Sequence, residues 1–184
     1  MPAREALLQL VNEGYLVGTT RGFMVPVLTL DAVRDSFEVR KLLEPRAAAS
    51  AARDMDEEGQ GALRAASGRA RTAAESQDFE KLVLAMIDFR AAWLGSVRNA
   101  RLASTLARFA DHVQTVRLAT LRDPSTQVVA ADGLCELASA FLSRDMIAVS
   151  DRMATHIAIA EHAFSALHRV SELEPMKEAA QCSS

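Results

Sequence analysis

Apolar side chains recur at helical spacing along most of this chain, and this periodicity limits the fold more than any other feature. From about residue 29 to about residue 170 no convincing strand pattern is present. The breaks between the periodic segments are short, such as "RDPS" at 122–125. Because short connections make neighbouring helices antiparallel, the sequence predicts an all-α antiparallel helical bundle. Its helices are expected near 56–75, 78–97, 99–122, 125–143 and 145–169.

An earlier helix is expected in "TLDAVRDSFEVRKLLEPRAAASAA". Thr29 or Asp31 can cap its start by accepting hydrogen bonds from free backbone N–H groups. Pro45 is expected to kink or break this helix, because proline removes a backbone hydrogen bond and crowds the preceding turn. At the other end, the polar segment 171–184 is expected to be a disordered tail.

The composition supports a cytoplasmic protein with a helical core. Hydrophobic residues make up 49% of the 184 residues and aromatic residues only 5%, so the core must be built mainly from small and aliphatic side chains. The net charge of −3 does not indicate nucleic-acid binding by bulk basicity. No apolar run approaches the roughly 20 residues of a membrane span, and no signal peptide precedes the first helix.

Sequence motifs of common enzymes are absent. The chain has no P-loop, dinucleotide-binding, zinc-protease or serine-hydrolase motif. None of its four histidines has a second histidine four residues away, so no helix-borne metal clip is visible. We therefore expect that the chain is not an enzyme.

Two polar side chains, His156 and Arg90, are candidates for a ligand site. His156 lies on the apolar face of the last predicted helix, as a hydrogen-bonded core histidine or as a polar group inside a ligand cavity. Arg90, in "MIDFRAAW", is either solvated or directed inward. An inward arginine needs a partner, since a buried unpaired charge is costly, and an anionic ligand can bind it bidentately.

The first residues form a different pattern. Pro2 to Asn12 reads as a helix, and "YLV" and "FMV" flank the glycine-bounded tip "GTTRG" of an expected hairpin. Arg4 lies in the first turn of the helix and Arg21 at the hairpin tip. A helix followed at once by a hairpin with a basic tip is half of a winged helix-turn-helix, in which the helix enters the major groove of DNA.

Several segments together resemble one family. "PAREALLQLVNEGYLVGTTRGFMV" resembles the recognition helix and wing of GntR-type transcription regulators. The segments "LDAVRDSFEVRKLLEPRAAASAA", "FRAAWLGSVRNARL" and "LASAFLSRDMIAVSDRMATHI" resemble helices of the FadR-type effector domain, the FCD domain. The resemblance implies a dimerising bundle of about six helices that binds a small organic acid or related metabolite and thereby controls the binding of operator DNA. For an intact DNA-binding head it implies contacts from Arg4, Arg21 and Gly22.

The family's metal site is altered in this sequence. Many members bind a divalent metal through one Asp and three His, and the corresponding positions here are Met86, Arg90, Leu134 and His156. Methionine, arginine and leucine do not build such a site with one histidine. Asp88, two residues away, is expected to face elsewhere. We therefore expect no metal cofactor and a pocket in which these four residues bind a partly apolar carboxylate, with Arg90 as its anchor.

The resemblance also implies a domain organisation. Residues 1–28 correspond to part of a winged helix-turn-helix, 29–170 to the effector and dimerisation domain, and 171–184 to the tail. About 40 residues that the family has before its recognition helix have no counterpart here, so Met1 falls where that helix begins. The alternative is a dimeric ligand-binding or interaction module without DNA binding.

Overall fold

The computed structural model describes residues 2–12, 16–19, 22–24 and 29–181, and its main body is a bundle of helices. This confirms the predicted all-α class. Within the described residues the bundle has seven helices: α2 (Leu30–Asp54), α3 (Glu57–Glu75), α4 (Phe79–Gly95), α5 (Ala100–Ala107), α6 (Ala110–Thr120), α7 (Pro124–Leu142) and α8 (Met146–Gln181).

The helix starts follow the expected capping chemistry. The side chain of Thr29 accepts a hydrogen bond from the backbone N–H of Ala32 at the start of α2. Asp56, Asp78, Asn99 and Asp123 cap α3, α4, α5 and α7 in the same way. Each cap satisfies an N–H group that has no partner inside its helix, so the local sequence determines where these helices begin.

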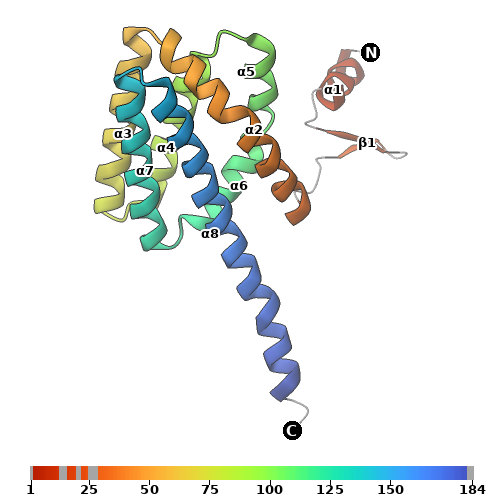
Figure 1. Ribbon diagram of the computed structural model, residues 1–184. Coiled ribbons are helices and arrows are strands. Elements are labelled where there is room, and N and C mark those ends of the chain that lie inside the picture. Colours follow the sequence, from red (N-terminus) through yellow and green to blue (C-terminus); the bar gives the residue numbers. More distant parts are fainter. Residues whose placement is uncertain (1, 13–15, 20–21, 25–28, 182–184) are drawn as a thin grey trace.

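The core lies between two groups of packed helices (Figure 1). α3 packs against α4 and α7, while α8 packs against α2 and α7. Fully buried alanines line the C-terminal part of α2 and the inner face of α3 and allow the helices to approach closely. These alanines are Ala47, Ala48, Ala51, Ala52, Ala66 and Ala70. Larger buried side chains, including Phe37, Phe89, Trp93 and Phe141, fill the remaining space.

Pro45 does not break the first long helix. α2 continues from Leu30 to Asp54 with Pro45 inside it. Alanines at 47, 48, 51 and 52 are fully buried directly after the proline, and this packing holds the helix on its C-terminal side. Of the expected kink or break at Pro45, the break does not occur, because tertiary packing outweighs the loss of one backbone hydrogen bond.

The predicted helix 99–122 is two helices. α5 ends at Ala107 and α6 begins at Ala110, with Phe109 at its N-cap position. The carbonyl oxygen of Leu106 accepts from the backbone N–H of Phe109 at 3.2 Å and from Arg90 Nη2 at 3.0 Å. The long-range contact with Arg90 partly satisfies the carbonyl at the end of α5, which sequence periodicity alone does not reveal.

The last helix is also longer than expected. α8 continues to Gln181, where the sequence predicted a disordered tail from residue 171. The segment after Ser171 contains Glu, Leu, Met, Lys and Ala, which all favour helix. In Figure 1 the C-terminal part of α8 projects beyond the body of the bundle.

The N-terminal segment contains α1 (Pro2–Asn12), β1 (Val17–Thr19) and β2 (Gly22–Met24). The two strands form an antiparallel hairpin in which Val17 pairs with Met24 and Thr19 with Gly22. The first strand is thus shifted toward the tip relative to the predicted "YLV". Figure 1 shows α1 and the hairpin beside the bundle. In the described part of the chain, no helix has both the length and the apolar character that a membrane span requires.

Candidate functional site

A cavity inside the bundle is the strongest candidate for a binding site. It has a volume of about 60 Å³, which is room for roughly four to six water molecules. Residues of α2, α4, α6, α7 and α8 line it. Most of its wall is apolar, with Phe89, Trp93, Val116, Leu134 and Met153 among the lining residues.

A buried ion pair on α2 forms one side of the cavity. Arg40 Nε donates a hydrogen bond to Glu44 Oε1 at 2.8 Å, and Arg40 Nη2 lies 3.5 Å from Glu44 Oε2. The two residues are one helical turn apart, so they share a face. Their side chains are 5% and 1% exposed, which places both charges inside the bundle.

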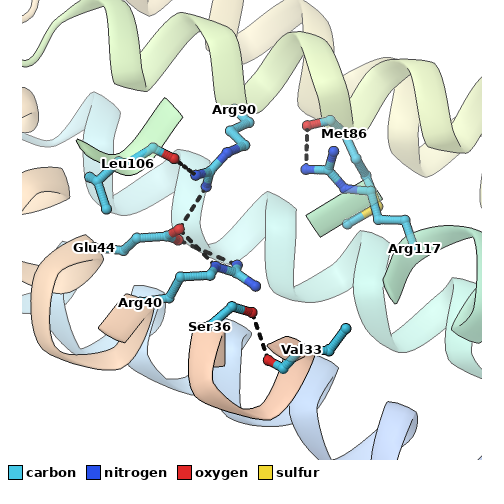
Figure 2. A network of polar contacts seen from close by, with 8 residues as sticks. All are labelled: Val33, Ser36, Arg40, Glu44, Met86, Arg90, Leu106 and Arg117. Atoms are coloured by element: carbon cyan, nitrogen blue, oxygen red, sulfur yellow. Dashed lines mark hydrogen bonds and ion pairs between the residues drawn. The ribbon is translucent and has the colours of Figure 1, made fainter. Parts of the chain in front are cut away.

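Arg90 on α4 joins this pair (Figure 2). Its Nη1 donates to Glu44 Oε1 at 2.8 Å, and its Nη2 donates to the carbonyl oxygen of Leu106 at 3.0 Å. Its guanidinium carbon lies 5.5 Å from the ring centre of Trp93, within the range of a cation–π contact. Arg90 therefore links α2, α4 and the end of α5 at the edge of the cavity.

The carboxyl group of Glu44 remains ionised in this setting. Burial alone would raise its pKa, but the neighbouring charges of Arg90 and Arg40 and their hydrogen bonds lower the pKa below the usual value. In the opposite sense, burial lowers the pKa of Arg90, and the carboxylate of Glu44 counteracts part of that shift.

Arg117 on α6 is the third arginine of the cavity. Its Nη2 donates to the carbonyl oxygen of Met86 at 3.0 Å (Figure 2). Among the described residues no carboxylate lies within ion-pair distance of it. Burial, followed by the charges of Arg90 and Arg40, lowers the pKa of Arg117 to about 9. Arg117 therefore carries a positive charge at neutral pH without a carboxylate to balance it.

His156 on α8 completes the polar part of the wall. Burial and the nearby charges of Arg117 and Arg40 lower its pKa to about 4, so the imidazole is neutral at physiological pH. Three guanidinium groups and one carboxylate then give the described lining of the cavity a net charge of +2. Such a cavity is complementary to an anion.

A second hollow leads toward the same arginines. It has a volume of about 380 Å³ and is lined by residues of α4, α5 and α6, including Ile87, Ala91 and Gln114. Arg90 and Arg117 border both this hollow and the inner cavity. The lining of this hollow also includes the carboxyl side chain of Asp111.

The structure brings the four predicted pocket residues together. Arg90, His156, Met86 and Leu134 all line the inner cavity. Asp88 faces elsewhere, as expected, and its Oδ2 lies 2.8 Å from Arg69 Nη2, with both side chains exposed.

Sequence reasoning missed Arg40, Glu44 and Arg117. A signal existed for the first two, because they interrupt the apolar stripe of α2 that runs through Val33, Phe37 and Ala47. Charged residues in core-facing positions are unusual unless they are paired or functional. Arg117 directly follows the buried Val116, but that position alone does not show which way its long side chain points.

The lining does not fit a divalent metal. The positions that correspond to the family's metal ligands hold a thioether, a guanidinium, an isobutyl group and one imidazole, and all four line the cavity. In the part of the chain that the structure describes, no three His, Cys, Asp or Glu residues gather as a metal site. The donor set is therefore unsuited to the metal chemistry of those relatives.

Two of the predicted DNA contacts, Arg4 and Gly22, lie outside the bundle. Arg4 is exposed on α1. Gly22 opens β2 with φ +136°, a conformation that favours glycine. Arg21 lies outside the described residues.

Comparison with known proteins places the chain in a family. The model of the FCD domain matches residues 35–159, which include most of the bundle and every cavity residue named above. This chain belongs to the FCD domain family. The solved structures that resemble it include a transcriptional regulator of the GntR family. No curated protein sequence matches the chain significantly.

Several solved structures have a fold similar to that of this chain. McbR/YncC of E. coli has a TM-score of 0.70 at 20% sequence identity, over 90% of this chain and 83% of that chain. A GntR protein of Streptococcus agalactiae has a TM-score of 0.61 at 20% identity, over 87% and 80%. A GntR family member from Pseudomonas syringae pv. tomato str. DC3000 has a TM-score of 0.58 at 19% identity, over 92% and 72%.

Proposed function

We propose that this chain is the effector-binding part of a DNA-binding regulator. In this proposal the bundle dimerises and binds a small effector of the organic-acid type in its inner cavity, and effector binding controls the affinity of the protein for operator DNA. The excess of buried positive charge around the cavity carries the proposal. Burying an unbalanced charge costs free energy, and an anionic effector would supply the missing partner.

The position of the charges suggests how effector binding reaches the DNA-binding end. Arg40 and Glu44 belong to α2, and α2 is the first described element after β2. An anion that changes the contacts between Glu44 and Arg90 acts on the helix that follows the hairpin. Effector and operator must then alter each other's affinity by the same factor.

The single tryptophan makes effector binding measurable. Trp93 is the chain's one tryptophan and it lines the cavity beside Arg90. We expect organic acids that bind there to change its fluorescence and to raise the melting temperature, since a ligand that binds only the folded state stabilises it. The hit compounds should then change operator affinity in a mobility-shift assay. Compounds that bind the cavity but never change that affinity would count against the proposal.

For DNA contact we propose Arg4, Arg21 and Gly22, in a protein with a complete winged helix-turn-helix. The exposed position of Arg4 on α1 and the positive φ of Gly22 support this assignment. The alternative is a dimeric ligand-binding module without DNA affinity. The same mobility-shift assay separates the two, because the module would bind effector and leave every DNA fragment unshifted.

A further inference from the structure

The carboxylate of Glu44 already acts as an internal anion in the cavity. Its Oε1 accepts from Arg40 Nε and from Arg90 Nη1, each at 2.8 Å. Its Oε2 lies 3.5 Å from Arg40 Nη2. Two of the three guanidinium groups are therefore bound to one side chain of the protein itself (Figure 2).

Arg117, unlike Arg40 and Arg90, has no hydrogen bond to Glu44 among the described contacts. A guanidinium has five N–H donors, and the described contacts of Arg117 use one nitrogen, on the carbonyl oxygen of Met86. Arg90 and Arg40 are close enough for their charges to destabilise its protonated form. Among the three guanidinium groups of the cavity, that of Arg117 would therefore gain most from contact with a negative group.

The charge and the walls of the cavity together define the ligand. The described lining has a net charge of +2, so a ligand with one negative charge would leave half of it unbalanced. The rest of the wall is largely apolar, with Val113, Val116 and Leu134 among its residues. Such a wall suits a short carbon skeleton more than a fully hydrated inorganic ion.

We infer that the cavity binds a small organic dianion, with Arg117 as its main ligand and Glu44 as an internal competitor for Arg90. This inference rests on the proposed function, because it names the chemical class of the effector. One negatively charged oxygen of the dianion binds the guanidinium of Arg117. Another lies near Arg90 and Arg40, where it competes with Glu44.

The test compares three small probes on the full chain near neutral pH and at constant ionic strength. Succinate is a dicarboxylate, methyl phosphate is a dianionic monoester, and butyrate is a monoanion with the same carbon number as succinate. Trp93 fluorescence gives the affinities. We expect at least one dianion to bind at least about tenfold more tightly than butyrate. If succinate binds more tightly than methyl phosphate, the ligand is a dicarboxylate; if methyl phosphate binds more tightly, it is a phosphate monoester. Both results support the inference.

Two variants test the assignment of Arg117. Arg117→Met should weaken dianion binding at least about tenfold, and it should raise the melting temperature of the ligand-free protein because it removes an unbalanced buried charge. Arg69→Met is the matched control, since Arg69 is exposed and pairs with Asp88 outside the cavity. It should leave dianion affinity unchanged. Glu44→Gln removes the competing charge and should strengthen anion binding. If Glu44→Gln does not fold, the comparison of Arg117→Met with Arg69→Met still tests the assignment of Arg117.

Three results would overturn the inference: butyrate binding as tightly as both dianions, neither dianion binding, or unchanged dianion affinity in Arg117→Met. Its failure differs from failure of the proposed function. If butyrate binds as tightly and changes operator affinity, the proposed function stands and the dianion assignment is wrong. If a dianion binds through Arg117 but operator affinity never changes, the ligand assignment stands and the regulatory function is wrong.

Discussion

Glu44 Oε1 accepts hydrogen bonds from both Arg40 Nε and Arg90 Nη1, and each donor lies 2.8 Å away. The first contact lies within α2, whereas the second joins α2 to α4. Because Glu44 is 1% exposed, water does not replace either contact. One carboxylate oxygen thus holds two helices together on one side of the cavity.

Replacing this carboxylate should destabilise the fold. Glu44→Ala leaves two buried guanidinium groups without a counter-charge, and we expect a loss of about 3–5 kcal/mol in the free energy of unfolding. Urea denaturation followed by Trp93 fluorescence measures it. Glu136→Ala is the control, because Glu136 forms an exposed pair with Arg152 and should lose at most about 1 kcal/mol. Equal losses in the two variants would contradict the structural role of Glu44.

Acid should destabilise the protein through His156. Burial and the charges of Arg117 and Arg40 hold the pKa of His156 at about 4 in the folded chain, against an ordinary value of 6.5. Between these two values the unfolded chain binds more protons. Stability should therefore be level above about pH 6.5 and decrease as the pH falls toward 4, by up to about 3 kcal/mol.

The variant His156→Gln isolates this effect. Its stability should depend less on pH than that of the wild type over the same interval. Burial also lowers the pKa of His112, but His112 is present in both proteins, so the difference between them comes from His156. Denaturation curves at a series of pH values provide the comparison. If His156→Gln and the wild type have parallel profiles, the buried imidazole does not titrate as described.

The connections between α3 and α4 and between α7 and α8 each contain a non-glycine residue with positive φ. Substituting glycine should change stability in opposite directions at the two positions. Gln77 has φ 54° and is exposed, so Gln77→Gly should stabilise the protein by about 1 kcal/mol by removing the strain of a Cβ atom. Arg144 has φ 55°, but its guanidinium donates to the carbonyl oxygens of Arg53 and Met55, each at 2.8 Å. Arg144→Gly should therefore reduce stability in thermal unfolding. A gain in both variants would show that the Arg144 contacts contribute little.

Arg4 should contribute to DNA affinity in a protein that has a complete DNA-binding head. Arg4→Ala should weaken operator binding in a mobility-shift assay and leave dimerisation unchanged by sedimentation. If the contact is to a phosphate, the slope of log affinity against log salt should fall by about 1. Arg64→Ala, an exposed change on α3, is the control. Unchanged operator affinity in Arg4→Ala would argue against α1 as the recognition helix.

Much of the fold could be predicted from periodicity and capping residues. Asp56, Asp78 and Asp123 cap helices close to the predicted starts. The split between α5 and α6 could not be predicted, because the contact of Arg90 with Leu106 joins residues that are distant in sequence. The prediction at Pro45 considered only the local effect of proline on the helix. The packing of the alanines after it, which the sequence alone does not show, keeps α2 continuous.

The candidate site could be predicted only in part. His156 stood out because it lies on the apolar face of its predicted helix, and Arg90 because an inward arginine needs a partner. The family resemblance marks both positions and added Met86 and Leu134. Arg40 and Glu44 are four residues apart, a spacing that more often describes a solvated surface pair, and their burial depends on α4 and α8 covering α2. The unbalanced charge of Arg117 becomes visible only when the surroundings of all three guanidinium groups are known.

The unbroken course of α2 from Leu30 to Glu44 has a mechanical consequence. Fourteen residues separate Glu44 from Leu30, the first residue of the helix, and at 1.5 Å per residue this is about 21 Å. In the proposed function, a ligand that shifts α2 at Glu44 is expected to shift the end of α2 that is nearest in sequence to the hairpin as well. A glycine pair inserted midway between Leu30 and Glu44 should then uncouple the two ends.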